Sequence, residues 1–137
     1  MTAVAETIIR DRFERQAARE LLQDEFDRYS IATIRNPEPL LLLDLRHEGM
    51  SLLGVSTDAV RAKAQVAGRR FSQLLYDLTN FDGITYMSRI TNKQCVAVYD
   101  RAVIPKLEAD SPAPDLPQLA TLRTILQKLH ITTIARA

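Results

Sequence analysis

The stretch "DGITYMSRITNKQCVAVYDRA", residues 82–102, decides the fold of this chain. Two runs with the two-residue period of β-strands, residues 82–90 and 94–102, flank the polar segment "TNK". This arrangement predicts a β-hairpin. In the first run, Tyr86 and Ser88 share one face with two isoleucines, so a hydroxyl group lies among large side chains. What that hydroxyl contacts is the question that the sequence raises.

The segments around the hairpin alternate between helical and extended patterns. Apolar residues at helical spacing predict helices at about 3–12, 56–65, 68–80 and 119–129, with a further turn or helix at 21–26. Residues 28–36, 40–46 and 130–137 have strand-like patterns, and the proline-rich segment 108–118 is typical of a surface loop. The leucine run within 40–46 indicates a strand buried on both faces. We therefore predict an α+β fold, a mixed sheet with flanking helices, in a single domain over residues 1–137.

The charge balance argues against several classes of partner. Eighteen Lys and Arg residues face seventeen Asp and Glu residues, which gives a formal net charge of +1. Such a chain has no strong field to attract nucleic acid or an anionic membrane, so we expect no direct nucleic-acid binding. No apolar run approaches the ~20 residues of a membrane span, and charges come too early for a signal peptide. With Cys95 as its one cysteine, the chain is predicted to be cytoplasmic and reduced.

Common catalytic and ligand-binding motifs are absent from the sequence. There is no GxxxxGK[ST] phosphate loop, no GxGxxG fingerprint, no HExxH pair and no GxSxG elbow. Cys95, His47 and His130 are too few and too scattered for a zinc site, so no metal is predicted. Composition and motifs alone therefore indicate a mixed α/β domain of unspecified chemistry.

Two segments resemble the RES domain, the toxin half of bacterial RES–Xre toxin–antitoxin pairs. In "TAVAETIIRD" the family's glutamate corresponds to Glu6, and in the hairpin stretch its serine corresponds to Ser88. The closing "LATLRTILQKLHITTI" also resembles the family's final helix and strand. The family's arginine lies upstream of its glutamate, whereas only five residues precede Glu6 here. The resemblance thus implies an N-terminally truncated RES fold, similar to that of ADP-ribosyltransferases.

The resemblance also implies an activity. RES domains degrade NAD, either by cleaving its glycosidic bond or by transferring ADP-ribose, and an Xre-family antitoxin neutralises them. NAD would be the substrate, and no other cofactor is implied. Glu6 would stabilise the positive charge that develops on the ribose, since a carboxylate is suited to that task. Ser88 would hold a ribose or phosphate oxygen, and Tyr86 would stack on nicotinamide.

Simpler interpretations remain open for the same residues. Glu6 also suits an exposed helix start, Ser88 a strand serine bonded to nearby backbone, and Tyr86 a core position. One alternative is a catalytically inactive RES remnant that serves as a protein-interaction module and forms homo-oligomers. On either hypothesis, activity as an NAD glycohydrolase or an ADP-ribosyltransferase-like enzyme requires a site completed by the upstream segment that carries the family's arginine.

Overall fold

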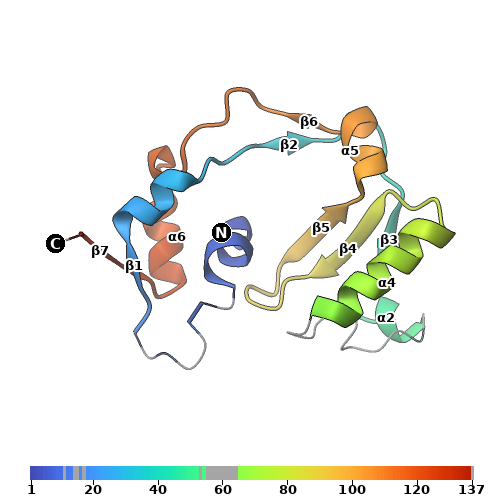
Figure 1. Cartoon of the computed structure of the whole chain (residues 1–137), viewed down its shortest axis with the longest axis horizontal. Coiled ribbons are helices and arrows are strands. Elements are labelled where there is room, and N and C mark those ends of the chain that lie inside the picture. The colour runs from blue at the N-terminus through green and yellow to red at the C-terminus, as the bar shows by residue number, and fades with distance from the viewer. Residues whose placement is uncertain (11, 14–15, 17, 53, 55–64, 137) are drawn as a thin grey trace. The chain divides into compact units, whose positions relative to one another are not determined.

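The computed structural model, shown in Figure 1, describes residues 1–10, 12–13, 16, 18–52, 54 and 65–136. The chain divides into two compact units. The first unit contains Ala3–Arg35 and the chain from Ala109 onward, and the second contains Asn36–Glu108. The strands β2 (Ile34–Arg35) and β6 (Glu108–Ala109), next to these boundaries, pair with each other.

The first unit is mainly helical. Its elements are α1 (Thr2–Val4), η1 (Ala5–Ile9), β1 (Glu20–Leu22), η2 (Gln23–Arg28), η3 (Leu116–Gln118), α6 (Leu122–Lys128) and β7 (Thr132–Ile134). The strands β1 and β7 pair in parallel, with Leu21 opposite Thr133. Buried apolar side chains from almost every element form its core: Val4, Ala5, Ile8, Ile9, Leu21, Phe26, Leu116, Leu126, Leu129 and Ile131.

The second unit is built on a three-stranded sheet in the order β3-β4-β5. Its elements are β3 (Leu42–Asp44), α2 (Gly49–Leu52), α4 (Gln65–Leu78), β4 (Gly83–Met87), β5 (Gln94–Val98) and α5 (Asp100–Lys106). The central strand β4 runs parallel to β3 and antiparallel to β5. A side chain at Gly83 would place its Cβ 2.1 Å from the carbonyl oxygen of Ala97, so only glycine fits at the start of β4, opposite the end of β5.

Asp82 connects three segments of the second unit. Its Oδ2 accepts hydrogen bonds from the backbone N–H of Leu41 and from Nζ of Lys106, both at 2.7 Å. Its carbonyl oxygen accepts a further bond from the N–H of Tyr99 at 2.7 Å. The ammonium group of Lys106, and then the Leu41 N–H, lower the pKa of the Asp82 carboxyl group. This nearly buried carboxylate therefore links the start of the hairpin to the segment before β3 and to the end of α5.

The main predictions about the fold are confirmed. The structure is a mixed α/β architecture of sheets with flanking helices, and the hairpin appears as β4 and β5. The helices expected at 68–80 and 119–129 are α4 and α6, and the last expected strand contains β7. The helix expected at 56–65 lies outside the described residues, except that Gln65 begins α4. The single domain over residues 1–137 stays a prediction.

Several boundaries were predicted wrongly. The second hairpin strand ends at Val98, and α5 begins at Asp100, where the strand was expected to reach residue 102. Within the segment 28–36, only β2 and an isolated bridge between Ser30 and Asp115 are extended pairs. The first helix ends at Ile9, earlier than expected.

The strand within 40–46 is not buried on both faces. Leu42 and Leu43 are half-buried, Asp44 is exposed and Leu41 has 57% of its surface exposed, whereas Leu45 is buried. In the described part of the sheet, β3 has β4 as its one neighbour, so it is an edge strand. Edge strands bury less surface than the central strands of parallel sheets, which explains the difference.

Candidate functional site

Glu6 lies on a π-helical turn near the start of the chain. It is the second residue of η1, in which the N–H of Arg10 donates to the carbonyl of Ala5 at 2.8 Å. Ala5, Ile8 and Ile9 are buried, whereas Glu6 is half-buried. The buried neighbours fix the backbone of Glu6. Single π-helical turns inside helices are frequent at functional sites.

Ser88 follows directly after β4, and its hydroxyl organises the turn of the hairpin. Only 2% of its surface is exposed. Its Oγ accepts hydrogen bonds from the backbone N–H groups of Ile90 at 3.2 Å and Thr91 at 3.1 Å. Its own backbone N–H donates to the carbonyl oxygen of Lys93 at 2.7 Å, and its carbonyl oxygen accepts from the backbone N–H of Asn92 at 2.9 Å. Local backbone bonds therefore explain why a hydroxyl is tolerated among large side chains.

These bonds define what else Ser88 can do. A hydroxyl group has two acceptor positions and one donor. Both acceptor positions of Ser88 are used by the turn, so any further partner must accept the hydroxyl proton. The oxygens of a carboxylate, a ribose or a phosphate are such acceptors.

Replacing Ser88 with alanine should destabilise the hairpin. The change leaves the N–H groups of Ile90 and Thr91 without their acceptor, and we expect a loss of about 2 kcal/mol in the free energy of unfolding. Urea unfolding followed by circular dichroism measures this loss. The matched change Ser30→Ala removes an exposed hydroxyl 3.4 Å from Asp115 and should cost less than about 0.5 kcal/mol. Equal losses in both variants would refute a structural role for the Ser88 hydroxyl.

Tyr86 lies two residues before Ser88 on β4. It is half-buried, and it pairs with Cys95 of β5 in the register of the hairpin. Because β4 ends at Met87, the expectation that the Tyr86 and Ser88 side chains share one face stays a prediction. These two residues belong to the second unit and Glu6 to the first. The catalytic roles of Glu6 and Ser88 and the binding role of Tyr86 stay predictions.

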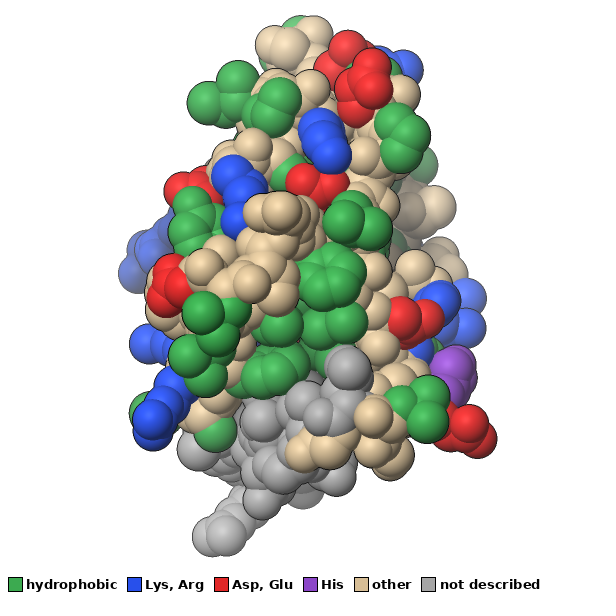
Figure 2. All heavy atoms as spheres, turned by 90° about the vertical axis from the view of Figure 1, so that its right-hand side faces the viewer, with side chains coloured by type: hydrophobic (Ala, Val, Ile, Leu, Met, Phe, Trp, Pro, Cys, Tyr) green, Lys and Arg blue, Asp and Glu red, His purple; other side chains and the backbone are tan. Residues whose placement is uncertain are grey.

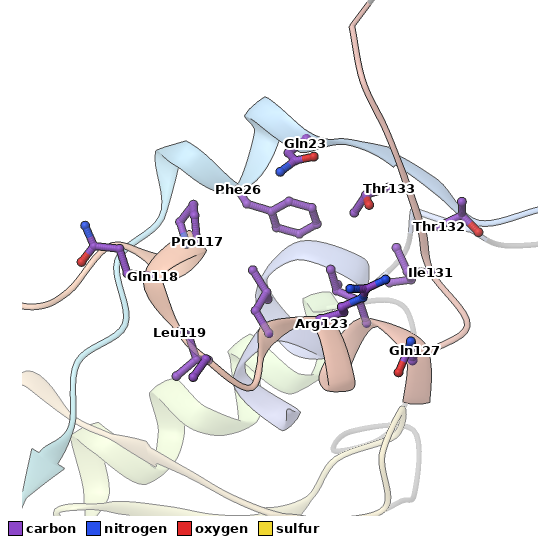
Figure 3. A pocket seen from close by; sticks show the side chains of 13 residues that line it. Gln23, Phe26, Pro117, Gln118, Leu119, Arg123, Gln127, Ile131, Thr132 and Thr133 are labelled. Carbon is purple, nitrogen blue, oxygen red and sulfur yellow. The ribbon is translucent and has the colours of Figure 1, made fainter.

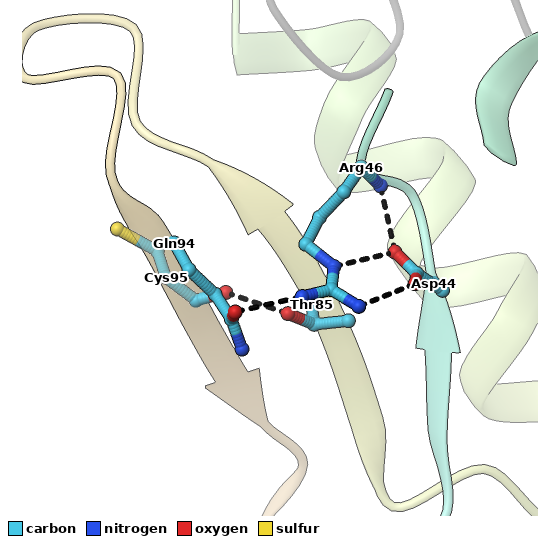
Figure 4. A network of polar contacts seen from close by, with 5 residues as sticks. All are labelled: Asp44, Arg46, Thr85, Gln94 and Cys95. Atoms are coloured by element: carbon cyan, nitrogen blue, oxygen red, sulfur yellow. Dashed lines mark hydrogen bonds and ion pairs between the residues drawn. The ribbon is translucent and has the colours of Figure 1, made fainter. Parts of the chain in front are cut away.

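The structure adds a polar network that the sequence did not reveal (Figure 4). Arg46 Nε donates to Asp44 Oδ1 at 2.9 Å and its Nη2 to Oδ2 at 2.7 Å, while its Nη1 donates to Gln94 Oε1 at 2.7 Å. Hydrogen bonds from Arg46 lower the pKa of the Asp44 carboxyl group to about 2. The network holds a cation in a fixed orientation beyond the end of β3.

Two aromatic rings of the second unit enclose another arginine. The guanidinium carbon of Arg101 lies 4.4 Å from the ring centre of Tyr76 and 5.4 Å from that of Tyr99. The two rings contact each other edge to face, and Arg101 Nη1 donates to the carbonyl of Thr79 at 2.9 Å. A hydrogen bond to Asp100 raises the pKa of Tyr76. These contacts pack α4 against the start of α5, a structural role.

The first unit contains an open hollow of about 720 Å³, shown in Figure 3. Phe26 and Leu126 form part of its apolar lining, and Gln23, Arg123 and Gln127 contribute polar side chains. Neither Glu6 nor Ser88 lines it. The hollow therefore gives no support to the predicted catalytic pair.

Within the described residues, His, Cys, Asp and Glu side chains form no group of three that could hold a metal ion. In the same residues, no helix combines the length and the apolar character required to span a bilayer.

Comparison with known proteins identifies the family. The family model described as "RES domain" matches residues 1–119, a segment that includes Glu6, Tyr86 and Ser88. The chain therefore belongs to the RES domain family. A curated relative, "Probable toxin y4kH" from Sinorhizobium fredii (strain NBRC 101917 / NGR234), is 38% identical over 91 residues, which cover 66% of this chain and 71% of the relative. No solved structure matches the chain.

Proposed function

We propose that the chain is a RES-type toxin domain that breaks the bond between nicotinamide and ribose in NAD. Membership of the RES family over residues 1–119 is the observation that carries this proposal. The relative described as a probable toxin adds support. A toxin must be restrained in the cell that makes it, so the proposal includes a cognate antitoxin of the Xre family as partner.

The chemistry assigns a role to Glu6. When the bond breaks, nicotinamide leaves with the bonding electron pair as a neutral molecule, and the ribose gains positive charge at C1′. A carboxylate beside the ring stabilises this charge more in the transition state than in the substrate. Water, phosphate or a protein side chain then bonds to C1′ and loses a proton. The half-buried Glu6 on its fixed π-helical turn suits the stabilising role.

Ser88 and Tyr86 would bind the substrate. Ser88, whose Oγ accepts hydrogen bonds from the N–H groups of Ile90 and Thr91 just after β4, would contact a ribose or phosphate oxygen of NAD. Tyr86, half-buried on β4, would provide a ring on which nicotinamide can stack. Neither role requires a metal ion or a second cofactor.

Release of nicotinamide from NAD tests the proposal directly. The purified chain is incubated with NAD, and the nicotinamide formed and the NAD lost are followed by liquid chromatography. NADH serves as a matched control, because its dihydronicotinamide ring lacks the cationic nitrogen that makes nicotinamide a good leaving group. We expect release from NAD and none from NADH. A rate with NAD equal to that of a protein-free blank would refute the activity of this chain.

A non-catalytic interaction module is the second candidate, and one observation favours it. Large apolar side chains of the second unit lie exposed on its surface, and Figure 2 shows hydrophobic side chains gathered on one face between charged ones. The most exposed are Leu52, Val66, Leu78 and Ile104. Such surface is typical of proteins that bind partners. Binding to an Xre-family antitoxin without any NAD turnover would select this candidate.

A further inference from the structure

The outer edge of β5 carries unpaired backbone groups in the described part of the chain. This strand pairs with β4 on one side and is the last strand of its sheet. Just outside the paired residues, the backbone N–H of Ser88 donates to the carbonyl oxygen of Lys93 at 2.7 Å. The N–H of Tyr99 donates to the carbonyl oxygen of Asp82, also at 2.7 Å. Hydrogen-bonded pairs alternate in an antiparallel ladder, so the backbone groups of Cys95 and Ala97 face β4. Those of Gln94, Val96 and Val98 face outward.

This edge lacks the features that usually prevent edge strands from pairing. Such strands are protected by charged side chains, proline, bulges or very short length. The five residues of β5, "QCVAV", contain no charge and no proline, and they pair with β4 in continuous register. Val96, at the centre, has 45% of its surface exposed. An extended backbone is therefore the natural partner of this edge.

We propose that the edge pairs with the same edge of a second copy of this chain, in antiparallel orientation about a two-fold axis at Val96. Val96 then faces Val96 of the second copy, and Gln94 faces Val98. All three outward-facing residues are symmetric about this axis, so every outward N–H and C=O group gains a partner. A self-complementary patch of this kind is what a two-fold dimer requires.

Charges at the two ends of β5 favour a second copy of the chain as the pairing partner of this edge. In this register Lys93 faces Tyr99 of the second copy and lies next to its Asp100. Lys93 and Asp100 are both exposed, so each interface end brings this pair of opposite charges together. The inference rests on backbone geometry and charge, and it is independent of NAD chemistry.

A cysteine cross-link tests the register. The proposed axis places Ala97 opposite Cys95 of the second copy in a non-hydrogen-bonded pair, where Cα atoms lie about 4.5 Å apart, within disulfide range. We expect Ala97→Cys to form a disulfide-linked dimer under mild oxidation, visible as a doubled mass on a non-reducing gel. The double variant Cys95→Ser, Ala97→Cys has no opposing thiol and should stay monomeric on that gel. Equal cross-linking in both variants, or none in either, would overturn the proposed pairing.

The oligomeric state in solution provides a second, independent test. Light scattering coupled to gel filtration should give twice the chain mass for the wild type and a single chain mass for Val96→Lys, which places like charges face to face. Ile104→Lys is the matched control, because it adds the same charge at a side chain on α5 that is 91% exposed. It should remain dimeric. A monomeric wild type, or a dimer lost only in Ile104→Lys, would contradict an interface at β5.

Discussion

Replacing Glu6 with glutamine should reduce NAD turnover by a factor on the order of 100 to 1000, the effect of removing one stabilising group at a developing charge. Glutamine keeps the size and hydrogen-bonding reach of the side chain but carries no charge. Because the carboxylate stabilises positive charge only as the glycosidic bond breaks, the loss should appear in kcat, with little change in KM. Initial rates of nicotinamide release over a range of NAD concentrations measure both constants.

Glu20→Gln is the matched control for this prediction. Glu20 is an exposed residue of β1 in the same unit, so the same chemical change is made away from the predicted site. NAD turnover by the Glu20→Gln variant should equal that of the wild type. Thermal unfolding of both variants shows whether the fold is retained. An active Glu6→Gln protein would exclude a charge-stabilising role for Glu6, even if the chain still cleaves NAD.

The elements that sequence patterns predicted well are those fixed by local interactions. The hairpin was predicted because alternating residues flank a polar turn, and Ser88, with its bonds to Ile90 and Thr91, completes that turn within the same segment. The amphipathic pattern of α4 was equally clear. By contrast, the alternation through "VAVY" continues past Val98, so periodicity alone did not show that Asp100 begins a helix.

Contacts between residues far apart in the chain could not be predicted from sequence patterns. The leucine run at β3 is compatible with burial on both faces, and only the sheet order shows that the strand has β4 as its one described neighbour. The residues of the candidate site also differ in whether the sequence could reveal them. Glu6 and Ser88 were found through family resemblance, whereas the network of Arg46 depends on Gln94, which is 48 positions away. No local spacing brings these two residues together.

Replacing Asp82 with alanine should lower the midpoint of thermal unfolding by about 10 °C, a large effect for a chain of this size. The side chain of Asp82 is 10% exposed, and its carboxylate accepts bonds from Lys106 and Leu41. Without it, the ammonium group of Lys106 keeps only the carbonyl of Pro39, at 3.2 Å, as a described partner. The N–H of Leu41 loses its acceptor as well. Differential scanning calorimetry measures the midpoint.

The control for this variant is Asp44→Ala. Asp44 also pairs with an arginine at 2.7 Å, but half of its side chain is exposed. Solvent screens an exposed ion pair, so this change should move the midpoint by no more than about 2 °C. If both variants unfold at the same temperature, Asp82 does not link the segments of the second unit as proposed.

The contribution of Asp82 should also depend on pH in a definite direction. Lys106 and the Leu41 N–H lower the pKa of this carboxyl group in the folded chain below its ordinary value of 3.8. As the pH falls, the unfolded chain therefore takes up the proton before the folded chain does. The stabilisation by Asp82 is full above about pH 5, and it is lost below pH 3.8, as the pH falls through the lowered pKa of the folded chain. Comparison of the wild type with Asp82→Asn isolates this group, because the other carboxylates titrate in both proteins. The difference in unfolding midpoint should stay constant from pH 7 to 5 and shrink toward pH 3. A difference that is unchanged or larger at pH 3 would show that the ion pair with Lys106 does not stabilise the fold.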